Sequence, residues 1–140
     1  MLWCVNVIFG SSVPNHNFQN QNLTKTYLEK NVRIVQYIEH FFEEGKFLIV
    51  MEFCEGGDLM QLIEKQRPKK HFPESTVKDF FLQMTKGTAY IHSKKILHCD
   101  LKPSNIFISS DQVLKIGDFG ISKKHNSTMS MANTVVGTDI

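Results

Sequence analysis

Apolar residues along the chain gather in short dense runs separated by polar breaks, beginning near Leu23. Residues 34–42 mix β-branched and aromatic side chains, residues 43–46 (E-E-G-K) supply turn residues, and residues 47–51 (F-L-I-V-M) are continuously apolar. Short runs of this kind, bounded by turn residues, are typical of β-strands. The pattern therefore predicts a β-hairpin whose second strand is buried on both faces.

Two helices are predicted after this hairpin. The glycines of residues 55–57 (E-G-G) end the apolar run, and Asp58 is well placed to cap a short helix that continues to about Gln66. Pro73 suits the first position of a second helix, because no hydrogen-bond donor is needed there. Helical spacing of apolar residues then continues to about Ser93.

The second predicted helix carries a single apolar stripe along its length. Core packing is the ordinary role of such a stripe. Gly87 lies inside the helix and weakens the prediction slightly, because glycine loses more backbone freedom than other residues when a helix forms. The residues of the stripe are Val77, Phe80, Phe81, Met84, Thr88 and Ile91.

A shorter hairpin is predicted further along the chain. Residues 106–108 (I-F-I) and 113–116 (V-L-K-I) have the composition of strands, and residues 109–112 (S-S-D-Q) between them form a turn cluster. Residues 122–138 are polar and without a clear period, so we expect a loop there. Residues 11–22 are rich in Ser, Asn and Gln and predict linker or disorder.

Composition adds few constraints. The 140 residues suffice for one domain, and a net charge of +2 gives no reason to expect nucleic acid or an anionic membrane as the main partner. The three cysteines lie far apart and are odd in number, so we expect no disulfide framework and a reducing compartment, cytoplasmic or nuclear. The apolar start is too short to span a bilayer and lacks the basic residues of a signal peptide.

The second hairpin makes a geometric prediction about chemistry. Asn105 comes just before its first strand and Asp118 just after its second, so both side chains should approach one site. An amide oxygen and a carboxylate suit a hard divalent cation such as Mg²⁺. Asp100 and Lys102 belong to the loop that leads into the same end. Together these groups supply what phosphoryl transfer needs: a base, charge neutralisation and magnesium.

The same residues resemble known motifs. Residues 98–105 (H-C-D-L-K-P-S-N) resemble the catalytic loop of protein kinases, and residues 118–120 (D-F-G) resemble their metal-binding triplet. Residues 53–59 (F-C-E-G-G-D-L) are similar to the hinge of these enzymes, especially in NIMA-related kinases. The resemblance runs from about residue 31 to 138 and implies an α+β, partial protein-kinase fold. That fold would comprise the end of the N-lobe sheet, the hinge, helices αD and αE, the catalytic-loop hairpin and the activation segment.

The resemblance implies a role for each residue at the end of the hairpin. Asp100 would accept or orient the proton of the substrate hydroxyl, and Lys102 would neutralise charge on the transferred phosphoryl group. Asn105 and Asp118 would hold the magnesium ions. Thr138 would brace the catalytic aspartate, which together with Lys102 favours serine/threonine over tyrosine specificity. The implied substrates are ATP and a protein with a Ser or Thr hydroxyl.

The resemblance also implies an adenine site. The backbone of Glu52 and Cys54 would bind the base, and Met51 would gate the rear of the pocket. Phe107 would pack beneath the ring, and Asp58 would lie near the ribose. Taken singly, Met51 and Phe107 would be interpreted as ordinary core residues, and only their place in the wider pattern favours a binding role.

The sequence departs from the kinase pattern in several ways. No G-x-G-x-x-G loop and no V-A-I-K-like segment precedes the matching region, and Cys99 stands where most kinases have arginine. The 140 residues contain no A-P-E segment after residues 118–120 (D-F-G). We therefore expect residues 1–22 to be disordered or outside the kinase domain, and residues 23–140 to form an incomplete domain. His98 is expected to be structural, packing beside Phe119.

Three functional hypotheses remain. The first is an ATP- and Mg²⁺-dependent serine/threonine protein kinase, although these 140 residues alone are expected to be inactive. The second is a catalytically dead kinase-like protein that binds partners through the incompletely covered apolar face of the second helix. The third, a metal hydrolase that uses Asp100, Asn105 and Asp118, leaves the hinge-like residues 53–59 unexplained.

Overall fold

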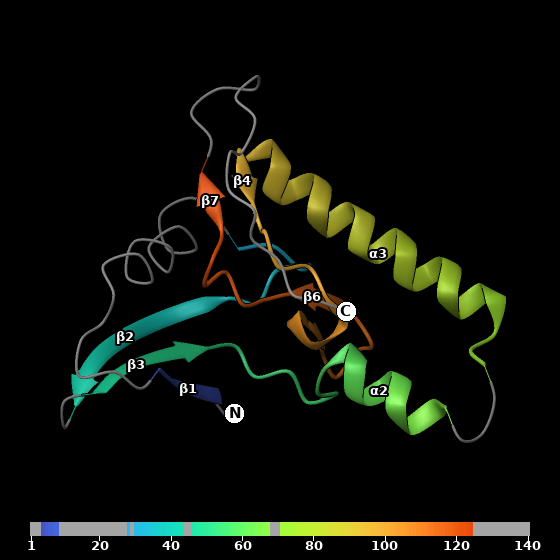
Figure 1. The fold of residues 1–140 in the computed structure, drawn as a ribbon, viewed down its shortest axis with the longest axis horizontal. Helices are drawn as coiled ribbons and strands as arrows, with labels where there is room; N and C mark the ends of the chain where they lie inside the picture. Colours follow the sequence, from blue (N-terminus) through green and yellow to red (C-terminus); the bar gives the residue numbers. More distant parts are fainter. Residues whose placement is uncertain (1–3, 9–27, 29, 44–45, 68–70, 125–140) are drawn as a thin grey trace.

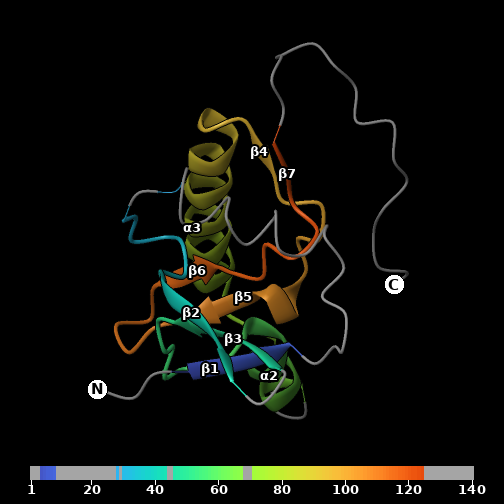
Figure 2. The same cartoon turned by 90° about the vertical axis from the view of Figure 1, so that its left-hand side faces the viewer.

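The structure is a computed structural model that describes residues 4–8, 28, 30–43, 46–67 and 71–124; for residues 4–8, 46 and 47 only the backbone is described. Helices and small antiparallel sheets combine in an α+β fold, as predicted. A sheet lies at one side of the molecule, the helices lie at the other, and a short hairpin lies between them (Figure 1). The turned view in Figure 2 shows helix α3 behind this hairpin.

The sheet contains the first predicted hairpin. Strand β2 (Tyr37–Glu43) pairs antiparallel with strand β3 (Lys46–Met51), which confirms the prediction. The three consecutive residues 48–50 are all buried. Because successive side chains of a strand point to opposite faces, β3 is covered on both faces.

Strand β1 (Cys4–Ile8) lies near the start of the chain. It pairs antiparallel with β3, giving the strand order β1-β3-β2. We expected residues 1–22 to be disordered or outside the kinase domain, and a strand at residues 4–8 agrees with the second of these alternatives without testing it. The other residues of that segment lie outside the described part of the chain, so the domain division at residue 22 stays a prediction.

The segment before β2 is also arranged differently from the prediction, which began this strand at Ile34. Ile34 instead forms a parallel bridge with Ile116. The Val35 amide donates to the Ile116 carbonyl at 2.9 Å, and the Ile116 amide donates to the Arg33 carbonyl at 2.8 Å. Residues 33–35 therefore form hydrogen bonds with the backbone of Ile116, at the end of the second hairpin. Strand β2 begins only after them, at Tyr37.

Both predicted helices are present. Helix α2 (Leu59–Gln66) is capped by Asp58, whose carboxylate accepts a hydrogen bond of 2.9 Å from the Gln61 amide. Helix α3 (Glu74–Ser93) begins one residue after Pro73, which occupies the cap position. A helix that starts in this way needs no amide hydrogen from the proline.

Helix α3 packs closely against the second hairpin at Gly87. A Cβ atom at this position would lie 2.9 Å from Cδ1 of Ile116, closer than ordinary contact allows. The glycine that weakened the helix prediction therefore permits the helix to approach the strand. Val77 and Phe81 of the predicted apolar stripe are exposed, so the stripe is only partly buried; Leu82, which was not part of the predicted stripe, is also exposed.

The second hairpin consists of β5 (Ile106–Ile108) and β6 (Leu114–Ile116), as predicted. Strands β4 (Ile96–Leu97) and β7 (Lys123–Lys124) pair antiparallel beside the end of α3, although residues 122–138 were predicted to be a loop. Residues 125–138 lie outside the described part of the chain.

The hydrophobic core lies between α3, α2 and the second hairpin, and its buried side chains are Leu28, Ile34, Leu59, Ile91, Ile96, Ile106, Ile108, Leu114, Ile116 and Phe119. Both strands of the second hairpin are therefore packed into the core, and close packing fixes the position of the residues at the open end of the hairpin. Within the described residues, no helix combines the length and the apolar character needed to cross a membrane.

Candidate functional site

The residues before the second hairpin form a tight cluster around Asp100. Asn105 ends a short 3-10 helix (Pro103–Asn105) and is almost fully buried. Its amide nitrogen donates to the Asp100 carbonyl at 2.9 Å and to Oδ2 of Asp100 at 3.0 Å. Because both bonds use the nitrogen, the amide oxygen of Asn105 is directed away from Asp100 and can serve a cation.

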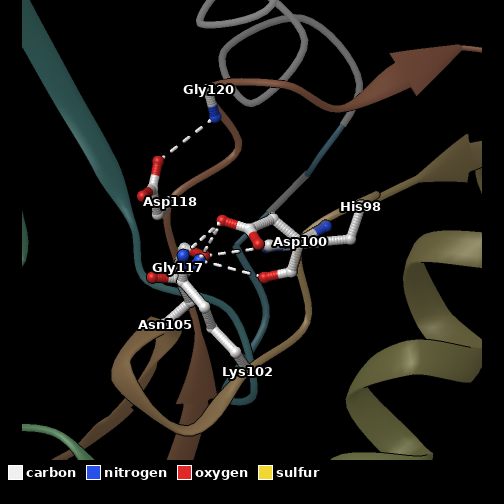
Figure 3. Close-up of polar contacts among 7 residues, drawn as sticks. All are labelled: His98, Asp100, Lys102, Asn105, Gly117, Asp118 and Gly120. Atoms are coloured by element: carbon white, nitrogen blue, oxygen red, sulfur yellow. Dashed lines mark hydrogen bonds and ion pairs between the residues drawn. The ribbon is translucent and has the colours of Figure 1, made fainter. Parts of the chain in front are cut away.

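Lys102 completes this cluster. Its Nζ lies 2.9 Å from Oδ2 of Asp100, the oxygen that also accepts from Asn105. Figure 3 shows the three side chains converging on one point. These contacts bring together Asp100, Lys102 and Asn105, the three residues that the sequence analysis placed near one another; their shared role stays a prediction.

Asp118 lies at the same end of the hairpin. Ile106 pairs with Ile116, and the Gly117 amide donates to the Asn105 carbonyl at 3.0 Å, so the residues flanking the two strands are adjacent. The Asp118 carboxylate is exposed and is turned toward Gly120, whose amide donates to Oδ1 at 3.3 Å (Figure 3). The hairpin therefore places both proposed metal ligands at one end, with Asp118 open to solvent.

Two residues of this site have left-handed backbone conformations. The φ angles are 68° at Cys99 and 56° at Asp118. Such angles are uncommon for residues other than glycine, and where surrounding structure enforces them they cluster at functional sites. The left-handed residue of the loop 98–105 is thus the neighbour of Asp100, and the left-handed residue of the triplet 118–120 is Asp118 itself.

His98 connects these two segments. Its Nε2 lies 2.8 Å from the Gly117 carbonyl, and its Nδ1 accepts from the Asp100 amide at 3.3 Å. Since a carbonyl can only accept, the proton of a neutral ring must lie on Nε2. The ring also packs against Phe119, with centroids 4.8 Å apart. His98 is thus structural, as predicted, and fixes the loop relative to the triplet.

Protonation of His98 should destabilise the fold. Burial lowers the pKa of the imidazole, while the Gly117 carbonyl and the nearby Asp118 and Asp100 carboxylates oppose this shift. Because the folded pKa lies below the unfolded value of about 6.5, stability is fully present above that pH and is lost as pH falls toward the folded pKa. Urea unfolding at a series of pH values below and above 6.5 measures this loss.

The variant His98→Gln provides the comparison for this prediction. It should lower the free energy of unfolding by about 1–3 kcal/mol at neutral pH, because it disturbs a buried hydrogen bond. It should also flatten the pH dependence near 6.5. The control variant His92→Gln removes an exposed histidine and should retain the wild-type profile. A wild-type profile in His98→Gln would show that His98 does not cause the dependence.

A separate pocket of about 190 Å³ lies between the sheet, α2 and the second hairpin. All five residues predicted to bind the nucleotide line it: Met51, Glu52, Cys54, Asp58 and Phe107. The structure therefore places these five residues around one pocket, and their binding of a nucleotide stays a prediction. Four further lining residues were missed: Val35, Phe53, Gly57 and Gln61. Gln61 of α2 comes three residues after the cap residue Asp58, and this helical spacing could have indicated that both side chains lie on the same side of the helix.

Glycines allow the pocket wall to approach the hairpin. The Gly56 amide donates to the Ile108 carbonyl, and the Ile108 amide donates to the Gly57 carbonyl, both at 2.9 Å. A Cβ at Gly56 would lie 2.9 Å from the Ile108 carbonyl oxygen, and Gly57 has a φ of +73°. The glycines of residues 55–57 (E-G-G) thus allow this part of the pocket wall to form backbone hydrogen bonds with strand β5, which contains Phe107.

The donor set fits magnesium bound together with a nucleotide. In the described part of the chain, no group of three or more His, Cys, Asp or Glu residues could hold a metal ion by itself. Mg²⁺ is commonly bound by one or two carboxylates together with substrate phosphates and water. The Asp118 carboxylate and the Asn105 amide oxygen suit that arrangement. Thr138, the remaining predicted site residue, lies outside the described residues.

Comparison with known proteins identifies the family of the chain. The model of the protein kinase domain matches residues 15–140. Serine/threonine-protein kinase Nek1 of Mus musculus is 44% identical over 109 residues, which are 78% of this chain and 9% of that protein. Serine/threonine-protein kinase Nek5 of Homo sapiens is 44% identical over 110 residues, 78% of this chain and 15% of that protein.

A third relative extends the similarity over more of the chain. Serine/threonine-protein kinase Nek11 of Homo sapiens is 38% identical over 132 residues, which are 92% of this chain and 20% of that protein. The chain therefore spans about a fifth or less of the length of these three relatives. The family match covers most of the chain, and the chain belongs to the protein kinase family, with similarity to the NIMA-related serine/threonine kinases.

Proposed function

We propose that this protein transfers the γ-phosphate of Mg-ATP to serine or threonine hydroxyls of protein substrates. The observation that supports this most strongly is the cluster of Asp100, Lys102 and Asn105, with contacts of 2.9–3.0 Å, beside Asp118 at the end of one hairpin. A carboxylate, an ammonium and two magnesium-type ligands are the groups that phosphoryl transfer requires.

The chemistry is divided among these side chains. Asp100 accepts or orients the proton of the attacking hydroxyl, and its carboxylate is held for this by Asn105. Lys102, paired with the same carboxylate, neutralises negative charge that develops on the transferred group. Asn105 and Asp118 would hold magnesium, which when bound supplies further charge neutralisation on the phosphates.

The pocket is the proposed site of the adenine and ribose. It is bounded by the backbone of residues 51–54, by Phe107 and by the start of α2. Backbone groups of Glu52 and Cys54 would bind the base edge, and Phe107 would support its face. One oxygen of Asp58 is already engaged as the helix cap, so its second oxygen is the group that would meet the ribose.

The direct test combines binding with phosphotransfer. Because these 140 residues alone are expected to be inactive, phosphotransfer is measured on the longest protein in which they occur. It is incubated with γ-labelled Mg-ATP and a serine- and threonine-containing protein such as casein, and phosphoamino acids are identified. In parallel, melting temperature is measured with and without Mg-ATP, since a ligand that binds only the folded state raises it. Labelled serine or threonine and a raised melting temperature would support the proposal.

A non-catalytic binding module is the second candidate. The exposed apolar residues of α3, which are 52% (Val77), 73% (Phe81) and 51% (Leu82) exposed, favour it because such groups mark association surfaces when they lie together. In the same experiment, an absent thermal shift together with absent phosphotransfer would favour this module over the kinase.

A further inference from the structure

An ion pair between a buried lysine and a partly exposed glutamate joins the pocket wall to the second hairpin. Lys115 of β6 is only 8% exposed, and its Nζ lies 2.7 Å from Oε1 of Glu52. Lysine is rarely buried unless its charge is paired. The proposed transfer reaction assigns no role to this ammonium group, so its position requires a separate explanation.

Glu52 is held at several points. Its second carboxylate oxygen, Oε2, accepts from the Gln36 amide at 3.1 Å, and its own amide donates to the Gln36 carbonyl at 2.8 Å. The carboxylate therefore links β6, through Lys115, to the segment that precedes β2. The residue whose backbone would bind adenine is fixed from both sides.

Lys115 also lies beside the floor of the pocket. It pairs with Phe107 across the hairpin, so the two side chains share one face of it. Gly117, two residues further along, approaches the same ring, because a Cβ there would lie 2.6 Å from Cε2 of Phe107. The neighbours Leu114 and Ile116 belong to the hydrophobic core. One face of the hairpin thus carries the ring and the ammonium that reaches Glu52.

We propose that Lys115 is a positioning residue for adenine binding, acting through Glu52. The ion pair sets the position of the Glu52 backbone, which would meet the edge of the base, relative to the Phe107 ring, which would support the face of the base. This inference rests on the proposed function. Lys115 is not among the residues that line the pocket, so it acts on the protein and not on the nucleotide.

The variant Lys115→Met tests the proposal, because it keeps the length of the side chain and removes its charge. Affinities for adenosine and for Mg-ATP are measured by calorimetric titration. Both should weaken by the same factor, about 10-fold, within the range of coupling between residues in direct contact. Lys115→Arg should restore most of the affinity. A loss confined to Mg-ATP would mean that the lysine acts on phosphates, and would overturn the proposal.

A matched control and a second variant guard against a general loss of stability. Lys78→Met removes another Lys–Glu pair, formed with Glu74 at 2.6 Å on the exposed face of α3, and should leave both affinities unchanged. Glu52→Gln should reproduce the loss seen in Lys115→Met, and serves if the latter does not fold. Unchanged adenosine affinity in a folded Lys115→Met or Glu52→Gln variant would overturn the proposal.

A measurement without nucleotide separates this inference from the proposed function. Hydrogen exchange at the Glu52 amide, which is bonded to Gln36, should be faster in Lys115→Met than in the wild type and in Lys78→Met. If the wild type bound neither adenosine nor Mg-ATP, the proposed function would fail. Faster exchange would then still support positioning of Glu52 by Lys115, and unchanged exchange would overturn it.

Discussion

Replacing Asp100 by asparagine should reduce the rate of phosphotransfer by about 10²–10⁴-fold, the usual contribution of a general base. The amide has nearly the shape of the carboxylate and can still accept the 3.0 Å hydrogen bond from Asn105. It cannot accept the hydroxyl proton or form an ion pair with Lys102. Because Asp100 lies outside the nucleotide pocket, affinity for Mg-ATP should be retained.

Single-turnover rates and nucleotide affinities, measured on the same preparations, decide this prediction. Asp111→Asn is the matched control, since Asp111 is an exposed residue of the turn between β5 and β6. It should have wild-type rate and affinity. A D100N variant that transferred phosphate as fast as D111N would exclude Asp100 from the reaction and would weaken the kinase proposal as a whole.

Replacing Asp118 by asparagine should remove most of the gain in nucleotide affinity that magnesium provides. We expect magnesium affinity to fall by about 100-fold. Mutation of a group that only hydrogen-bonds to a metal ligand costs about 10- to 100-fold, so loss of a ligand should reach at least the upper end of that range. Asparagine is a clean replacement, because it tolerates the left-handed conformation found at this position. The fold should therefore be preserved while the anionic ligand is lost.

The measurement is a titration of ATP with and without Mg²⁺. In the wild type, magnesium should strengthen ATP binding, and in D118N the two affinities should converge. Affinity for ATP alone should be similar in both proteins, because the adenine pocket is distinct from Asp118. Equal magnesium dependence in wild type and D118N would assign the metal to other residues.

Local sequence patterns predicted most elements of this fold. Apolar runs bounded by turn residues identified both hairpins, and the Asp58 cap located the start of α2, because these signals depend on neighbouring residues alone. The proximity of Asn105 and Asp118 was also predictable, since a hairpin brings its two ends together. Strand β7 was missed, because a pair of lysines becomes a strand only through its distant partner β4.

Features that depend on tertiary contacts could not be predicted from the sequence. The Lys115–Glu52 pair joins residues far apart in the chain, and no periodicity connects them. The direction of the Asp118 carboxylate was likewise outside what hairpin geometry predicts. Gly87 shows the opposite case, in which a residue unfavourable for a helix is explained by the strand packed against it.

The position of strand β1 has a consequence for solubility. By pairing with β3, Cys4–Ile8 makes that highly apolar strand an interior one and occupies its second hydrogen-bonding edge. A protein shortened to begin at residue 23, as the sequence pattern would suggest, would present this edge to other molecules. Exposed apolar edges template strand addition between chains and hence aggregation. The short first strand thus covers the edge of the apolar strand β3 and takes its place as the edge of the sheet.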